Sequence, residues 1–342
     1  MAGSGGARGR SGAVSMARVA QVAGVSQQTV SRVANGLPNV SEDTRRRVLL
    51  AMEELGFRPN FAGKSLRSGR YNSVGLCLYN VEQFGNLVTI KGILSAAGAV
   101  GCAVTTVEMD ERAPLSLAEA TRRMVGLPID ALIISMSLLA EDFMAFQPQP
   151  GLSTVLLTMR EHPLCPTVDS DQYGCSTLVM DHLTAHGHRE IRHVGGPTGN
   201  VDASFRERGW RDALASRGIE PTEPLRGDWT ADSGYEAGAA LARDASMTAV
   251  YAANDQMAVG VVEALRDAGR RVPEDVSVVG VDDSLRGTIP HVGLTTVRFD
   301  LARRGEVAVE LALRGTEPGQ RPRAVRIAPT LVERRSVADA RA

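Results

Sequence analysis

Four residues in the second half of the sequence carry side chains that could bind one polar ligand: Arg206, Trp229, Asn254 and Asp282. Asn254 and Asp282 each follow an apolar, strand-like run, and Arg206 begins a helical stretch after another such run. Trp229 stands in a loop region. Arginine, asparagine and aspartate pair with neighbouring hydroxyl groups, and an indole ring packs against the apolar face of a pyranose. Two plainer interpretations stay open: Asp282 as a structural loop carboxylate and Trp229 as a core residue.

The elements that would position these residues begin near Ser73. Apolar runs alternate with Ala- and Leu-rich stretches of helical length; the runs are VGLCLY, CAVTTV, ALIIS, TVLLT, IRHVG, AVYAAN and VSVVGVD. This alternation predicts doubly wound α/β structure with parallel sheets. About 270 residues of the pattern exceed one small sheet, so we expect two lobes. Ligands of such folds bind outside the carboxyl ends of the strands.

Catalytic, cofactor and metal patterns are weak in this sequence. It has no G-x-S-x-G motif and no Cys/His constellation, and Gly63-Lys64-Ser65 lacks the earlier glycine of a phosphate-binding loop. His182 and His186 have the i, i+4 spacing of metal ligands, but Leu183 stands where a zinc protease needs glutamate. A helix that ends near Gly187 explains the histidines more simply. We therefore expect no enzyme activity, no cofactor and no metal.

Charge is distributed unevenly along the chain. Residues 1–70 contain ten Arg and one Lys against four acidic residues, a balance of +7, which leaves 27 basic and 35 acidic residues, or −8, for the remainder. A basic head on an acidic body predicts an anionic partner for the head alone. Nucleic acid, an anionic membrane and an acidic protein all fit that description.

The basic head has the pattern of a helix-turn-helix. A first helix is expected to end at Gly24, and Ser26 is a suitable N-cap for a second helix, SQQTVSRVAN. Ser41 then caps a third helix that ends before Gly56. Two amphipathic helices joined by a short glycine-containing turn are typical of DNA-binding proteins.

The polar face of the second helix supplies the candidate DNA contacts. Its apolar stripe leaves Gln27, Gln28, Ser31 and Arg32 outward, and glutamine and arginine can pair bidentately with adenine and guanine. Short polar groups suited to phosphate oxygens are found at Ser26, Thr29 and Asn35. A three-helix bundle with a solvated polar face is the alternative.

The run VAQVAGVSQQTVSRVANGLPNVSEDTRRRVLLAMEELGFRPN resembles the DNA-binding domain of the lactose/galactose repressor (LacI/GalR) family. The resemblance implies a DNA contact at Asn39 and continues through PNFAGKSLRSGR, which is similar to the family's hinge. In the family this hinge forms a short helix on operator DNA and a leucine wedges into the minor groove, a role that falls to Leu66. Gly63 replaces the usual alanine and disfavours helix by roughly 1 kcal/mol. An ordinary linker leucine is the alternative.

The resemblance extends over the rest of the chain through HLTAHGHREIRHVGG, FRERGW, GDW, AANDQMAVG, VPEDVSVVGVDD and LTTVR. It implies a two-lobed effector domain like that of periplasmic binding proteins. Arg206, Asn254 and Asp282 then match effector-hydroxyl contacts, Trp229 an aromatic wall and Ser135 a polar contact. The first lobe departs from the family pattern at LYNVEQFGNL, so we expect Tyr79, with Gln83 and Asn86, to line the pocket instead.

These observations predict a domain organisation. We expect a disordered tail at 1–15, a helix-turn-helix domain at 16–59, a hinge at 60–70 and an effector-binding and dimerisation domain at 71–342. By analogy with the family, lobe one comprises about 72–168 and 299–327, and lobe two comprises about 169–298 and 328–342. The chain ends without the leucine heptads of lactose-type tetramers, which favours a homodimer.

The compartment follows from the N-terminus and the cysteines. The first fifteen residues lack the apolar core of a secretory signal, and no run approaches the roughly 20 apolar residues of a membrane span. Cys77, Cys102, Cys165 and Cys175 show no C-x-x-C spacing, which favours free thiols. We expect a cytoplasmic protein that does not bind membranes.

Together the residues and the resemblance predict a repressor of a carbohydrate-utilisation operon. It would bind a palindromic double-stranded operator and be released by a small sugar, a galactoside or other β-linked disaccharide. Alternatives are a corepressor-dependent regulator, an activator, an architectural DNA binder, and a sugar-binding protein, cytoplasmic or periplasmic, without a regulatory role.

Overall fold

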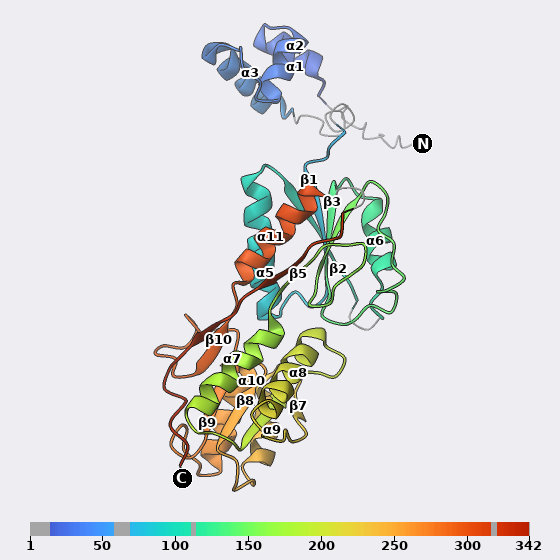
Figure 1. Cartoon of the computed structure of the whole chain (residues 1–342). Helices are drawn as coiled ribbons and strands as arrows, with labels where there is room; N and C mark the ends of the chain where they lie inside the picture. The colour runs from blue at the N-terminus through green and yellow to red at the C-terminus, as the bar shows by residue number, and fades with distance from the viewer. Residues whose placement is uncertain (1–13, 58–68, 111–113, 316–319, 342) are drawn as a thin grey trace, which may run out of the picture. The chain divides into compact units, whose positions relative to one another are not determined.

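A computed structural model describes residues 14–57, 69–110, 114–315 and 320–341 (Figure 1). The chain divides into two compact units, Met1–Tyr71 and Asn72–Ala342. Most of the expected tail and most of the expected hinge, including Leu66, lie outside the described residues.

The first unit is helical in its described part, with α1 Met16–Ala23, α2 Gln27–Ala34 and α3 Glu42–Leu55. Each cap predicted from the sequence is confirmed. The Thr29 amide donates to Ser26 Oγ over 3.1 Å, and the Ser41 hydroxyl accepts from Thr44 at the start of α3. Gly24 ends α1 at φ 64°, a conformation that glycine adopts without strain. The core consists of valines from all three helices, together with Ala20, Ala23, Ala51 and Met52.

The second unit contains two six-stranded sheets within the described residues. The first sheet is parallel, in the order β11-β5-β4-β3-β1-β2. Its strands are β1 Ser73–Leu78, β2 Ala103–Glu108, β3 Ala131–Ser135, β4 Ser153–Leu157, β5 Thr167–Ser170 and β11 Ala324–Ile327. The second sheet has the order β12-β10-β9-β8-β6-β7, with β12 antiparallel to β10. Its strands are β6 Ile191–Gly195, β7 Leu225–Arg226, β8 Ala249–Ala252, β9 Ser277–Val281, β10 Thr295–Arg298 and β12 Thr330–Val332.

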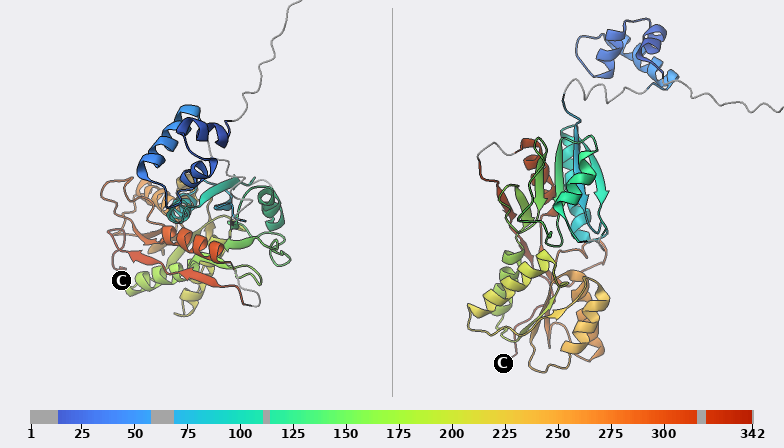
Figure 2. Two further views of the ribbon diagram at one scale, coloured as in Figure 1. Left: turned by 90° about the horizontal axis from the view of Figure 1, so that it is seen from above. Right: turned by 90° about the vertical axis from the view of Figure 1, so that its right-hand side faces the viewer.

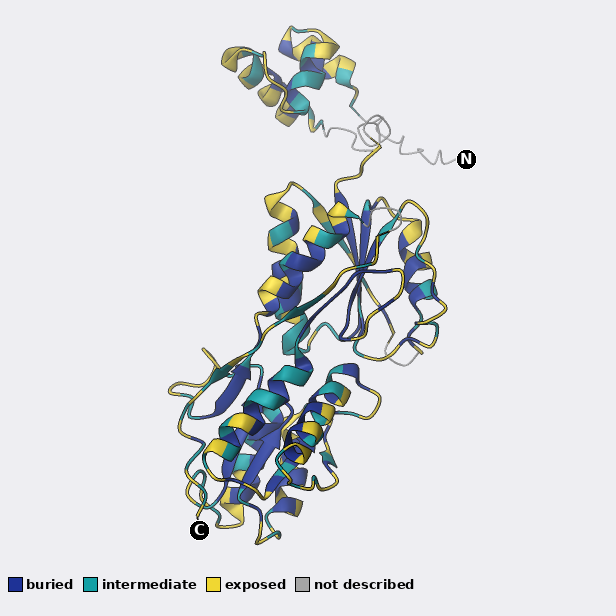
Figure 3. Cartoon of the chain, viewed as in Figure 1, coloured by how far each residue is buried: buried dark blue, intermediate teal, exposed yellow. Residues whose placement is uncertain are grey.

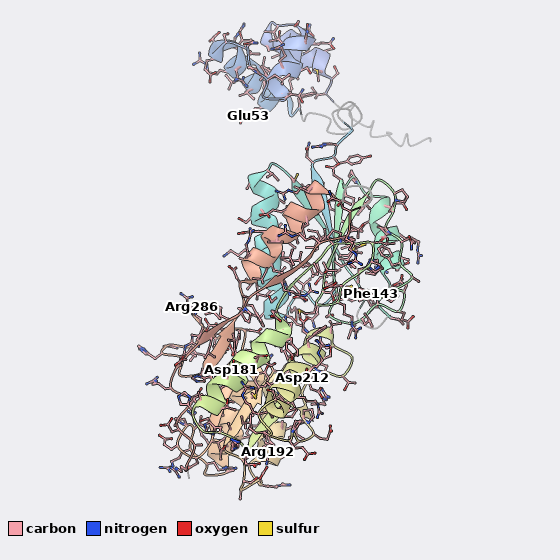
Figure 4. The ribbon with its side chains drawn as sticks, viewed as in Figure 1. Glu53, Phe143, Asp181, Arg192, Asp212 and Arg286 are labelled. Carbon is pink, nitrogen blue, oxygen red and sulfur yellow. The ribbon has the colours of Figure 1, made fainter. Side chains whose placement is uncertain are left out.

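Helices cover both faces of each sheet (Figures 1 and 2). On the first sheet they are α5 Phe84–Ala99, α6 Leu117–Val125 and α11 Leu301–Arg314. On the second they are α7 Gln172–Ala185, α8 Val201–Ala215, α9 Ala231–Leu241 and α10 Asp255–Asp267. Helices α5 and α11 pack closely because Gly92 has no side chain: a Cβ there would collide with the backbone of Ala302. Helices α7 and α8 pack side by side, with Asp181 on the first and Asp212 on the second (Figure 4).

The two expected lobes are therefore present, one around each sheet. The chain passes between them after β5, after β10 and after β11. Strand β5 keeps Asp169 and Ser170 in the first sheet, so the lobe boundary expected at 168 falls inside a strand. All seven strand-like runs of the sequence form strands.

Burial follows the sheets, whose strands are mostly dark blue in Figure 3. Five strands were not expected from the sequence: β5, β7, β10, β11 and β12, each of two to four residues. Runs this short carry little periodicity.

Cys77, Cys165 and Cys175 are buried free thiols and Cys102 is half-buried. In the described part of the chain, every helix is too short or too polar to cross a bilayer.

Candidate DNA-binding surface and effector site

The first turn of α2 presents Gln27 and Gln28 to solvent, as the sequence predicted. Asn39 is also exposed, in the turn before α3, at φ 66°. Ser26 and Thr29 are hydrogen-bonded to each other through their hydroxyls over 2.9 Å. That contact shapes the start of the helix and leaves the two glutamines as the long polar side chains of its first turn.

The Arg32 side chain is oriented differently from the expectation, while its contact with DNA stays a prediction. Its side chain does not extend outward from α2 but folds back, is half-buried, and donates from Nη2 to the Pro38 carbonyl over 2.7 Å. Asn35 is similarly engaged, because its Nδ2 donates to the Ser31 carbonyl over 2.6 Å. Arg32 thus holds the loop that follows the helix, and Asn35 holds the last turn of the helix itself.

A cavity of about 400 Å³ lies between the two sheets of the second unit and is lined from both lobes. This volume is within the usual range of about 300–1,000 Å³ for small-molecule sites. It contains five of the six residues predicted to bind the effector: Ser135, Arg206, Trp229, Asn254 and Asp282.

Arg206 organises the second-lobe wall of the cavity. It lies in the middle of α8 rather than at its beginning, because the helix already starts at Val201. The guanidinium is buried, donates from Nε to Gln172 Oε1 over 2.8 Å and also donates to the Ala253 carbonyl. Its Nη2 lies 3.6 Å from Asp282 Oδ1. Arg206 therefore connects α8 with α7 and with the ends of β8 and β9.

Asp282 directly follows β9 at φ 102°, a region that residues with a side chain rarely adopt. Burial raises the pKa of its carboxyl, and the neighbouring Arg206 opposes that rise. A strained, largely buried aspartate at a strand end is typical of a ligand site.

Asn254 and Trp229 are linked through the Asn254 side chain. Asn254 Oδ1 caps α10 by accepting from the Met257 amide over 2.9 Å, and its Nδ2 donates to the Trp229 carbonyl over 2.9 Å. The Trp229 ring lies 5.6 Å from the Arg206 guanidinium carbon and contacts Gly196 so closely that a Cβ at Gly196 would overlap it. The four residues singled out from the sequence thus share one wall.

The expectation that Tyr79 lines the cavity is wrong. It is buried in the apolar core of the first lobe and is not part of the cavity lining, whereas Gln83 and Asn86 do line it. Tyr79 directly follows β1, and its side chain packs with Cys77 in the core that covers the α6 side of the sheet. Ser135, at the end of β3, stands at the cavity as expected.

Family models match two segments of the chain. Residues 15–60 match the bacterial regulatory proteins of the lacI family, and residues 180–337 match the periplasmic binding protein-like domain. The chain is 31% identical to the lactose operon repressor of Escherichia coli K12 over 94% of its own length and 90% of the relative's. The chain belongs to the LacI/GalR family.

Two solved structures support this assignment. The lac repressor dimer bound to operator and the anti-inducer ONPF is 29% identical, with a TM-score of 0.84 over 95% of this chain and 99% of that one. The complex of the regulator CelR with cellobiose is 28% identical, with a TM-score of 0.69 over 94% and 99%. The LacI/GalR protein described here is a DNA-binding transcriptional regulator with an effector domain of the sugar-binding type, and not an enzyme.

Among the residues of this LacI/GalR protein that line the cavity without having been predicted are Asp169, Asp202 and Arg304. Arg304 is buried in α11, donates from Nη1 to Asp169 Oδ1 over 2.9 Å and from Nη2 to Thr89 Oγ1 over 2.7 Å. Asp169 lies in a strand too short to recognise. The sequence spacing could have identified Asp202 as a cavity residue, because Asp202 precedes Arg206 by four positions and so lies on the same face of the helix.

Proposed function

We propose that the protein represses a carbohydrate-utilisation operon as a homodimer on a palindromic operator. A small sugar, a galactoside or other β-linked disaccharide, releases it. The observation that carries the proposal is the cavity wall in which buried Arg206 is held beside Asp282, with the Trp229 ring next to it. Arginine and aspartate together satisfy both the acceptor and the donor of vicinal hydroxyls, and the indole provides an apolar face.

The cavity also provides a way for a ligand to change the protein. Its lining comes from both lobes, and the lobes touch beside it, where the Val201 amide donates to the Ser137 carbonyl over 2.9 Å. A ligand that contacts both lobes favours one lobe orientation over another. The proposed hinge, residues 60–70 with Leu66, would transmit this preference to the DNA-binding unit. The coupling is reciprocal: a sugar that weakens operator binding binds the operator complex more weakly.

The exposed residues of α2 support the DNA-binding part of the proposed function. Exposed Gln27 and Gln28 lie in the first turn, where a recognition helix reaches base edges. The proposed cytoplasmic location belongs to the same function, because the operator lies there.

Operator selection from random DNA tests this function. Selection is repeated with lactose, cellobiose, monosaccharides and purines, and with the Asp282→Ala variant. We expect a palindromic site whose affinity falls in the presence of one sugar, and no such response in Asp282→Ala. Strengthening by a purine would point instead to a corepressor. Failure to select any sequence at moderate salt would refute the DNA-binding role.

A further inference from the structure

Asp202 is the cavity carboxylate that the site described above does not use. It lies in the first turn of α8, one turn before Arg206, and lines the cavity. Its Oδ1 is buried and has no hydrogen-bond partner among the residues that the structure describes. A buried acceptor left without a donor costs about 1–3 kcal/mol, so such atoms call for a partner from outside the chain.

The other buried carboxylates of the cavity have cationic partners. Asp169 accepts from Arg304 over 2.9 Å, and Asp282 lies 3.6 Å from Arg206. Asp228, at the rim, accepts from the Thr230 hydroxyl over 2.6 Å. Two arginines and five acidic residues line the cavity in the described part of the chain, and the acidic ones are Glu82, Asp169, Asp202, Asp228 and Asp282. The lining therefore carries excess negative charge.

Helix stabilisation does not explain Asp202. An acidic residue in a first helical turn interacts favourably with the helix dipole, and a solvated one does so without a desolvation cost. Asp232 occupies the equivalent second position of α9 and is exposed. Asp202 has a buried oxygen instead. Burial and the neighbouring Asp169 carboxylate raise the pKa of Asp202, and the nearby Arg206 and Arg304 guanidiniums oppose that rise. Burying this carboxylate oxygen without a ligand therefore costs folding free energy.

We infer that the effector carries a protonated amine that pairs with Asp202, so that the ligand class is an amino sugar rather than a neutral one. The inference rests on the proposed function, because it names the ligand of the same cavity. An ionised carboxylate only accepts hydrogen bonds, and an ammonium group only donates them. Hydrogen bonds between two charged groups are about twice as strong as neutral ones. The ammonium would donate to the Asp202 carboxylate where it lines the cavity and would offset the excess negative charge of the lining.

Calorimetric titration of the full-length protein with matched sugars tests the inference. The probes are glucosamine, glucose and N-acetylglucosamine, the corresponding galactose series, and cellobiose with its diamino counterpart. We expect an amino sugar to bind about tenfold or more tightly than its neutral partner. Asp202→Asn should remove that preference and keep the shape of the site. Asp232→Asn is the matched control and should leave every affinity unchanged.

The possible results distinguish a failure of the amino-sugar assignment from a failure of the proposed regulatory function. A neutral or N-acetylated sugar that binds as tightly as its amine, or an amine preference that survives in Asp202→Asn, overturns the ammonium assignment while leaving a sugar-responsive regulator. If none of the saccharides binds and none weakens operator binding, both fail. Circular dichroism and operator affinity of Asp202→Asn establish that the variant is folded.

Discussion

The Arg206 guanidinium lies 3.6 Å from the Asp282 carboxylate, although 76 residues separate them in the chain. Both are largely removed from water, and the arginine has further partners in Gln172 and the Ala253 carbonyl. The pair fixes one wall of the effector cavity before any ligand arrives, which reduces the ordering needed on binding.

Arg206→Ala should destabilise the second unit by about 3–5 kcal/mol, because it leaves Asp282 buried without its counter-charge. Both tryptophans of the chain, Trp210 and Trp229, belong to this unit, so urea unfolding followed by tryptophan fluorescence reports on it. Alanine at exposed Arg243 is the control and should change stability little. A variant as stable as the wild type would contradict the structural role.

Gln28→Ala should weaken operator binding by about 1–3 kcal/mol and relax base preference at one position of each half-site. Fluorescence anisotropy with operators that vary at single positions measures both effects. Alanine at Gln21, exposed on α1, controls for loss of a surface amide. An equal loss on all operators would assign Gln28 to the DNA backbone.

Arg32→Ala should act differently, because Arg32 holds the Pro38 carbonyl. Loss of a hydrogen bond to a charged group costs about 1.5–3 kcal/mol, so the first unit should melt at lower temperature and bind every operator variant more weakly. Circular dichroism melting and anisotropy measure the two effects. Selective loss at one base position, without a stability change, would instead support the base-reading role predicted from the sequence.

Trp229→Ala should weaken sugar binding and abolish any change in fluorescence that the sugar causes. The other tryptophan, Trp210, is fully buried in the core of the second lobe and should not respond. Titration of the wild type and of Trp229→Phe provides the comparison, since phenylalanine keeps an apolar face. A sugar-dependent signal in Trp229→Ala would place the ligand elsewhere.

Asp255 should make stability depend on pH. Burial raises its pKa to about 7, although Thr296 and Ser284 donate hydrogen bonds to it. The folded state therefore binds a proton that the unfolded state releases near pH 4, and stability falls as pH rises from about 4 to 7. Melting of wild type and Asp255→Asn across this window isolates the group. The wild type should lose stability relative to the variant, and a constant difference would argue against the shift.

The local parts of this structure could be predicted from the sequence. The caps at Ser26 and Ser41 bond residues three positions away, and Gly24 ends its helix through its own backbone, so neighbours in the chain suffice. The long apolar strands follow from composition, and the rule that ligands bind at the carboxyl ends of strands predicted Asn254 and Asp282 as cavity residues. Family resemblance added Ser135.

The tertiary structure decided where long side chains go. Whether Arg32 extends or folds back depends on a loop six residues away, and Tyr79 is in the core because of how β1 meets α6. The pairing of Asp169 with Arg304 joins residues 135 positions apart, and the isolation of Asp202 is defined only once those partners are in place. Sequence determines local conformation because its interactions span one helical turn, whereas charge pairing in a cavity depends on contacts that exist only after the chain has folded.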